Sequence, residues 1–135
     1  MIRENNEYYV SLEVAKLLRE IGFDWNCYKV YKTDVTENLT LFTYTKEEGY
    51  RNTSEFICSA PTLDVAQRWL REVKDIDVYI FPDTNGKREC VYKVGIKIFG
   101  RTSWIPPFTA QYNTYEEAQE AGIKKALEII LEKGE

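Results

Sequence analysis

Residues 61–99 read PTLDVAQRWLREVKDIDVYIFPDTNGKRECVYKVGIKIF, and this stretch predicts the fold most clearly. It starts as an amphipathic helix, with Thr62 at the N-cap position and apolar residues at helical spacing. An alternating strand over 76–81 follows, and the Asn-Gly pair at 85–86 is the strongest short signal for a β-hairpin. A long strand then returns over about 88–99, so the stretch predicts a helix beside an antiparallel hairpin.

Alternation along the returning strand predicts two faces. The side chains expected to face the core are those of Cys90, Tyr92, Val94, Ile96 and Ile98. Lys93 and Lys97 should lie on the opposite face, where Tyr79 and Phe81 of the preceding strand should join them. Cys90 is therefore expected to be a buried and inert thiol.

Two further helices are predicted, one on each side of this stretch. The first covers 11–22, with Ser11 as its N-cap and Gly22 at its C-terminal end. The last begins at the capping box Thr114-x-x-Glu117 and runs to about residue 131. Its small residues, which should let it pack closely on a sheet, are Ala118, Ala121, Gly122 and Ala126.

The remaining segments predict short strands and one exposed loop. The strands are expected at 28–33, 39–45, 55–59 and 108–112, the last antiparallel to the long strand, and the loop at 46–54. The fold class is therefore α+β, a single domain over 1–135 with three helices on antiparallel sheets. It comprises a helix-hairpin unit at about 9–55 and an α-β-β-β-α unit at about 56–135.

The two units contain similar sequences at the start of their helices. SLEVA at 11–15 mirrors TLDVA at 62–66, and each helix precedes a predicted hairpin. The similarity indicates either a duplicated helix-hairpin unit or two capped amphipathic helices that converged.

Composition excludes several familiar activities. The chain of 135 residues contains no histidine, which removes His-dependent triads and His-bearing zinc sites. The three cysteines are widely spaced, and no glycine-rich phosphate loop is present. Adjacent pairs at Glu47-Glu48 and Glu116-Glu117 point apart in most backbones and do not form an acid/base pair. We expect no catalytic residue, no cofactor and no metal.

The same features predict a cytoplasmic protein. The N-terminal MIRENNEYYV lacks the apolar core of a secretory signal, and no apolar run is long enough for a transmembrane span. The odd number of cysteines favours free thiols in a reducing compartment. The net charge of −4 disfavours membrane surfaces and nucleic acid as partners.

Two segments are candidate interaction surfaces. The first is the basic region that contains Lys87, Arg88, Lys93, Lys97 and Arg101. Lys93 and Lys97 alternate with Val91, Gly95 and Phe99, and together with Tyr79 and Phe81 they could form a stacking platform for single-stranded nucleic acid. Alternatively, the N-terminal helix and hairpin cover this face, which we favour because the first 55 residues must pack somewhere. The second is the apolar loop from Trp104 to Phe108, which either anchors a partner or closes one end of the core.

Three segments carry a resemblance to a known family: YVSLEVAKLLREIGFDW (9–25), CSAPTLDVAQRWLREVKDIDVYIFP (58–82) and YEEAQEAGIKKALEII (115–130). They resemble a family of small uncharacterised proteins from Bacteroides-type gut bacteria and their phages or prophages. The resemblance covers most of the chain and implies a cytoplasmic, phage-derived protein. It supplies no catalytic residues.

From residue 61 onward the predicted topology is similar to the double-stranded-RNA-binding fold. Such domains contact phosphates through lysines at the start of the last helix. Here Glu116, Glu117 and Glu120 occupy that position and would repel phosphate.

These observations predict a phage- or mobile-element-related accessory protein that binds another protein and performs no catalysis. The alternative is a nucleic-acid-binding module that uses the basic face around 87–101. A homodimer formed through the 104–108 loop is a further option.

Overall fold

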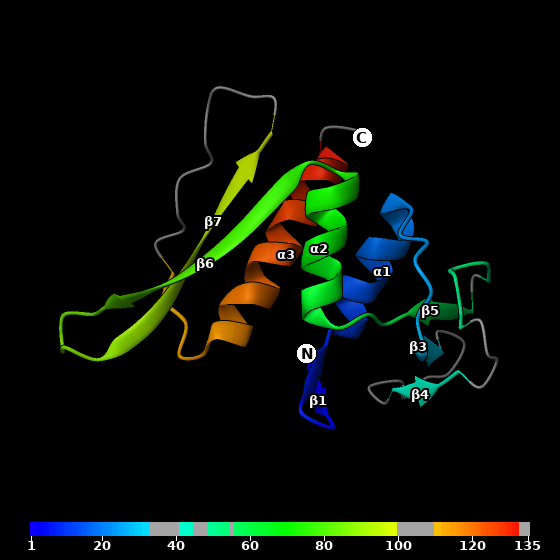
Figure 1. Cartoon of the computed structure of the whole chain (residues 1–135), viewed down its shortest axis with the longest axis horizontal. Helices are drawn as coiled ribbons and strands as arrows, with labels where there is room; N and C mark the ends of the chain where they lie inside the picture. The colour runs from blue at the N-terminus through cyan, green and yellow to red at the C-terminus, as the bar shows by residue number, and fades with distance from the viewer. Residues whose placement is uncertain (33–40, 45–48, 55, 100–109, 133–135) are drawn as a thin grey trace.

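The computed structural model describes residues 1–32, 41–44, 49–54, 56–99 and 110–132. Its helices are α1 (Leu12–Ile21), α2 (Leu63–Val73) and α3 (Tyr115–Glu132). Its strands are β1 (Ile2–Glu4), β2 (Glu7–Tyr9), β3 (Lys29–Lys32), β4 (Phe42–Thr43), β5 (Ile57–Ser59), β6 (Ile76–Thr84) and β7 (Cys90–Ile98). The helices lie between the long hairpin β6–β7 on one side and the small sheet β4-β3-β5 on the other (Figure 1). The predicted α+β class is confirmed.

All three helices begin at the hydroxyl side chains that the sequence predicts. The hydroxyl oxygens of Ser11, Thr62 and Thr114 accept the N–H groups of Val14 (3.3 Å), Val65 (3.2 Å) and Glu117 (3.1 Å). Gly22 ends α1 in the left-handed conformation, with φ of 104°. Each cap satisfies an N–H that the helix itself cannot pair.

Helix α3 packs directly on the hairpin. A Cβ built on Gly122 would lie 2.5 Å from both Val78 Cγ1 and Val94 Cγ2, so the helix can approach this closely only at a glycine. Val94 and Ile96 are fully buried, which confirms the predicted core face in the middle of β7. The close packing expected of the small residues in this helix is also confirmed at Gly122.

The prediction for Cys90 is wrong, because its side chain is exposed. Alternation places Cys90 on the same side of β7 as Val94, but the hairpin extends beyond the helices at this end (Figure 1). Alternation decides which side a residue faces, and it does not decide whether anything covers that side. The hairpin turn also differs from the simplest Asn-Gly form, since the left-handed residue is Arg88, with φ of 62°.

The N-terminal residues form a hairpin that the sequence analysis missed. Strands β1 and β2 pair antiparallel through Asn5 and Asn6, whose φ values are 52° and 63°. Two consecutive residues with positive φ are typical of a type I′ turn, and asparagine tolerates this conformation better than most residues. The Asn-Asn pair was the available signal.

The small sheet confirms the predicted pairing of the first strands in part. Strand β3 pairs antiparallel with both β4 and β5. Of the strand expected at 39–45, only Phe42–Thr43 is a strand in the described residues, and 33–40 lies outside them. The strand expected at 108–112 is represented by one antiparallel bridge between Tyr92 and Tyr112, while residues 100–109 lie outside the described range.

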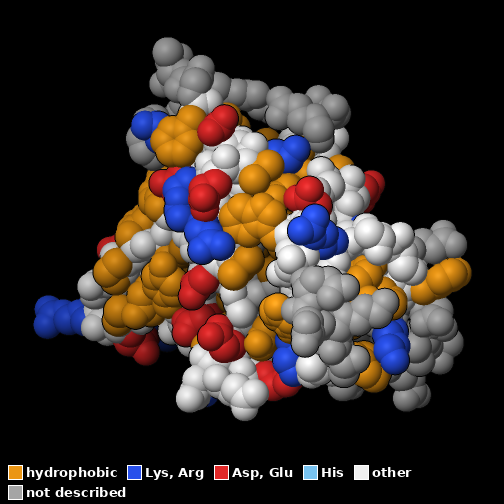
Figure 2. Space-filling model, turned by 45° about the vertical axis from the view of Figure 1, so that its right-hand side comes forward, with side chains coloured by type: hydrophobic (Ala, Val, Ile, Leu, Met, Phe, Trp, Pro, Cys, Tyr) orange, Lys and Arg blue, Asp and Glu red, His pale blue; other side chains and the backbone are white. Residues whose placement is uncertain are grey.

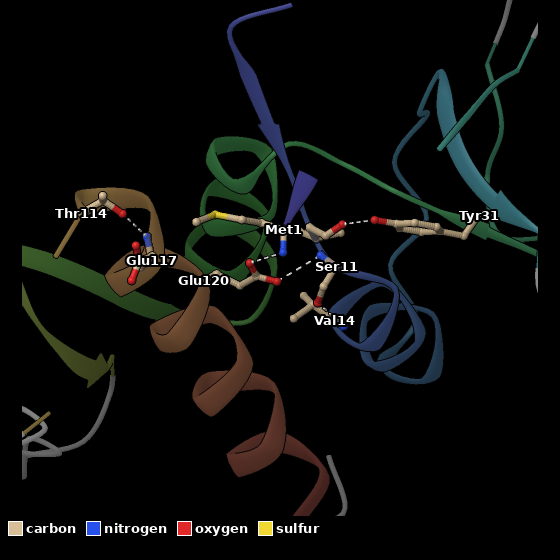
Figure 3. Close-up of polar contacts among 8 residues, drawn as sticks. Met1, Ser11, Val14, Tyr31, Thr114, Glu117 and Glu120 are labelled. Atoms are coloured by element: carbon tan, nitrogen blue, oxygen red, sulfur yellow. Dashed lines mark hydrogen bonds and ion pairs between the residues drawn. The ribbon is translucent and has the colours of Figure 1, made fainter. Parts of the chain in front are cut away.

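Polar contacts connect α3 to the start of α1. Glu120 accepts the backbone N–H of Ser11 at 3.0 Å and pairs with the Met1 amino group at 2.9 Å (Figure 3). Close by, the buried Tyr31 hydroxyl donates to the carbonyl of Val10 at 2.7 Å. The core is continuous, since its buried residues come from both predicted units.

The N-terminal helix does not cover the outer face of the hairpin as expected. Helix α1 packs on α3 and β5, and it lies on the far side of the helical layer from β6–β7 (Figure 1). That expectation is therefore wrong, because α1 packs against α3 and β5 instead. No helix in the described residues is long and apolar enough to cross a membrane.

Candidate functional site

Two adjoining clefts form the candidate site, which we call the Trp25 groove. The smaller cleft has a volume of about 190 Å³ and is lined mainly by Tyr9, Cys27, Tyr28, Lys29, Ala60, Pro61 and Val65. The larger and more open cleft is lined by Asp24, Trp25, Asn26, Arg51, Val65 and Arg68. Asn26 and Val65 line both clefts, so the two adjoin between the start of α2 and the turn after α1.

Trp25 is held in place from several directions. Its ring lies 6.4 Å from that of Phe23, which in turn contacts the buried Trp69 edge-on at 5.4 Å. The guanidinium of Arg68 also lies over the Trp25 indole, 4.9 Å from the ring centroid. Arg68 Nε also pairs with Glu72 at 3.2 Å, one helical turn further along α2. The Trp25–Arg68 stack is thus anchored to the core through Phe23.

The segment 49–54 contributes Arg51 to the lining of the larger cleft. Cys27 and Tyr50 exchange backbone hydrogen bonds of 2.8 and 2.7 Å, which join this segment to the residues just before β3. Arg51 Nε then donates to Asn26 Oδ1 at 2.6 Å. The guanidinium therefore lies at the cleft with its orientation set by Asn26.

The expectation that 46–54 is an exposed loop is wrong at Tyr50. Its side chain is only 4% exposed, and its hydroxyl donates to the carbonyl of Ile57 at 2.8 Å while accepting the N–H of Ser54 at 2.9 Å. Asn52 adds a second connection, because its side-chain oxygen accepts the N–H of Ser59. The hydrogen bonds of Tyr50 and Asn52 hold this segment in place, and they leave no periodic pattern in the sequence from which the burial of Tyr50 could be predicted.

Cys27 lines the smaller cleft, and its thiol is a candidate nucleophile. Burial raises the pKa of its thiol to about 12, although hydrogen bonding to Ser59 acts in the opposite direction. A thiol with such a pKa stays protonated at neutral pH, and the protonated form is a poor nucleophile. The chain offers no histidine to activate it. The described residues also contain no cluster of acidic or cysteine side chains that could hold a metal ion.

Four residues of the predicted basic surface lie in the described part of the chain: Lys87, Arg88, Lys93 and Lys97. Lys87 and Arg88 are exposed at the tip of the hairpin. Lys93 is 2.9 Å from Asp83, and this pairing lowers the pKa of the Asp83 carboxyl. Lys97 lies over the ring of Phe99 at 5.9 Å.

The aromatic residues of this face contact each other. Tyr79 and Phe81 stack with ring centroids 6.0 Å apart, and the Tyr79 ring covers Gly95. Arg101, Trp104 and Phe108, which complete the predicted surfaces, lie outside the described residues.

A second depression, of about 240 Å³, is acidic and lies where α2 and α3 begin beside the β1–β2 turn. Its charged lining residues are Glu7, Asp64 and Glu116. The buried Gln119 orients one of them, because its amide donates to Asp64 at 2.8 Å and to Gln67 at 2.8 Å. Carboxylates at helix N-termini are stabilised by the helix dipole, which gives Asp64 and Glu116 a structural role.

One face of the molecule shows how its charges are distributed (Figure 2). Lys and Arg side chains are interspersed with Asp and Glu and with patches of hydrophobic side chains (Figure 2). This mixed surface differs from the broad basic field typical of proteins that bind nucleic acid.

The chain matches no family model, no curated protein and no solved structure. The resemblance to gut-bacterial and phage proteins therefore stays a prediction.

Proposed function

We propose that this protein is a non-catalytic accessory protein that binds another protein through the Trp25 groove. The observation that carries the proposal is the Trp25–Arg68 stack, set in a concave surface beside Arg51 and Tyr28. Tryptophan, tyrosine and arginine are the residues that most often dominate the binding energy of protein interfaces. The phage or mobile-element setting rests on the resemblance of the sequence.

The groove is already organised for binding. Arg68 is fixed between Trp25 and Glu72, and Arg51 is fixed by Asn26. A partner would therefore immobilise few additional side chains, and ordering each such side chain costs roughly 0.5–1.5 kcal/mol. Preorganisation of this kind favours a role in recognition.

Addition of a partner strand at β6 is disfavoured by the edge of that strand. Tyr92 directs its N–H and C=O away from β6, toward Tyr112, so the opposed Pro82 faces the outer edge of the hairpin. Proline has no N–H to offer there. The side chain of Gln67 also caps the outward carbonyl of Val78 at 2.6 Å. Pro82 and Gln67 both reduce the capacity of this edge to pair with another strand, so the groove is the better surface for binding a partner.

The nucleic-acid alternative has a direct test. Mobility-shift assays with single- and double-stranded nucleic acid at about 50 mM salt favour electrostatic binding, because salt screening is weak there. The absence of any shift would exclude the face around 87–101 as a nucleic-acid site.

Affinity capture with purified variants tests the proposal. The wild type and the control Arg71→Gln, which changes an exposed residue of α2 outside the groove, should capture the same partner from a lysate of the source organism. Arg68→Gln and Val65→Asp should lose it. With the purified partner, calorimetry should show a loss of about 2 kcal/mol or more for Trp25→Ala, as for a central interface residue.

Circular dichroism spectra that match the wild type confirm that the groove variants fold. A partner that is retained by both groove variants, or a failure of the wild type to capture any partner, would refute the proposed function.

A further inference from the structure

We infer that the Trp25 groove recognises a linear segment of its partner that carries a carboxylate next to an apolar side chain. The inference rests on the proposed function and specifies the chemistry of the partner. It depends on the different character of the two clefts.

The larger cleft has the donors for a carboxylate. Arg51 and Arg68 both line it, and each uses its Nε within the chain, toward Asn26 and Glu72 respectively. The other N–H donors of each guanidinium belong to its two Nη groups. Paired N–H donors of this kind match the two oxygens of a carboxylate, and such bidentate contacts are shorter and stronger than neutral hydrogen bonds.

The larger cleft presents two cations to a bound segment. Its charged lining residues are Arg51, Arg68 and Asp24, and Glu72, which pairs with Arg68 Nε, lies outside the lining. Two arginines suit one or two carboxylates. A nucleic-acid strand would require a longer row of cations along its phosphates. Lys29, the nearest further cation of the groove, forms an ion pair with Glu4.

The smaller cleft accommodates an apolar side chain. Pro61, Ala60 and Val65 form its apolar side, and the Cys27 thiol, which stays protonated at neutral pH, adds no charge. Its volume of about 190 Å³ is sufficient for one aromatic or branched aliphatic side chain, since a cavity of roughly 150 Å³ can hold benzene.

The two clefts share Asn26 and Val65 in their linings, so one short segment that crosses these residues would reach both. An apolar side chain in the smaller cleft places the neighbouring residues of the segment at the arginines. The order of the two features in the segment is a result that the experiment supplies.

A displayed library of random 12-residue peptides, selected on the full chain, tests this inference. The selected peptides should combine Asp or Glu with a large apolar residue within a few positions. A synthetic copy of the best peptide should bind the wild type, Arg71→Gln and Val73→Asp equally. Arg68→Gln should weaken binding about tenfold or more, as expected for a lost hydrogen bond to a charged group. Val65→Asp should abolish it.

Three outcomes separate this inference from the proposed function. Peptides without acidic residues that still require Val65 would overturn the carboxylate assignment and leave groove-mediated protein binding intact. Peptides that bind Val65→Asp and Arg68→Gln as well as the wild type would overturn both. Failure to select any peptide would overturn recognition of a linear segment, whereas capture of a folded partner through the groove would still support the proposed function.

Discussion

Gly122 shows how strongly one residue constrains the packing of this fold. The two valines that face it, Val78 and Val94, belong to different strands of the hairpin, and both methyl groups lie where a Cβ would be. The sequence indicated a packing role, since glycine inside a helix otherwise lowers stability by about 1 kcal/mol relative to alanine. The identity of the facing residues required the structure, because it depends on the position of α3 along the hairpin.

Gly122→Ala should destabilise the protein despite the better helix propensity of alanine. Overpacking a well-packed core typically costs about 1–3 kcal/mol, which exceeds the gain of about 1 kcal/mol from propensity. Urea unfolding monitored by circular dichroism measures the difference. Lys125→Ala on the exposed side of α3 is the control, and Val78→Ala combined with Gly122→Ala should recover part of the loss. An unchanged or higher midpoint for Gly122→Ala would contradict the packing described.

The buried Cys27 thiol and Tyr31 hydroxyl should make the folded protein less stable at alkaline pH than at neutral pH. Burial raises the pKa of the Cys27 thiol from 9.0 to about 12 and also raises the pKa of Tyr31 above its ordinary value. Between about pH 9 and 12 the unfolded chain loses the thiol proton that the folded chain keeps. The folded state then binds more protons, so the free energy of unfolding decreases as pH rises.

Urea midpoints at about pH 8 and about pH 10.5 measure this decrease. Cys27→Ala removes one of the buried groups, so its urea midpoint should fall less between the two pH values than that of the wild type. Cys90→Ala, at an exposed position, should behave like the wild type. Equal midpoints at the two pH values would show that these groups do not titrate differently on unfolding.

At the scale of elements, capping and turn chemistry predicted most of the local structure, although the Asn-Asn turn between β1 and β2 was missed. The three helix starts and the hairpin at 85–86 were predicted for this reason. The possible duplication stays a prediction. Ser11 and Thr62 cap their helices with the same geometry, but β3 has a strand on each side while β6 pairs only with β7 among the described strands.

The β1–β2 turn provides a test at this scale. Asn6→Ile should lower stability by about 1–2 kcal/mol, because a β-branched residue is strained at a φ of 63°. Asn6→Gly is the matched control: it also loses the 3.0 Å hydrogen bond from Arg3, but it tolerates this conformation. Thermal unfolding compares the two variants. Equal melting temperatures would mean that the turn conformation contributes nothing to stability.

At the scale of the whole molecule, α3 connects the parts. It packs against α1, α2, β6 and β7, and its buried residues belong to the continuous core. Such an arrangement predicts one cooperative unit, even though two segments of the chain, 11–15 and 62–66, have similar sequences.

Leu127→Ala should therefore destabilise the entire chain. Its side chain is fully buried, and removal of a buried leucine typically costs about 2–5 kcal/mol. Near-UV and far-UV circular dichroism should report the same urea midpoint for the variant, as for the wild type. If the two signals separated, with one half of the chain unfolding first, the single-core description would be wrong.

Composition, periodicity and capping were enough to predict the fold class, the helices, the central hairpin and the lack of histidine chemistry, since these depend on neighbours along the chain. The Trp25 groove could not be predicted in this way. Its lining comes from Tyr9, 24–29, Arg51 and residues within 60–68, and Arg68 meets Trp25 only because α2 packs beside the turn after α1. The exposure of Cys90 and the burial of Tyr50 have the same origin. Each depends on which distant element covers a residue, and local sequence carries no direct record of that contact.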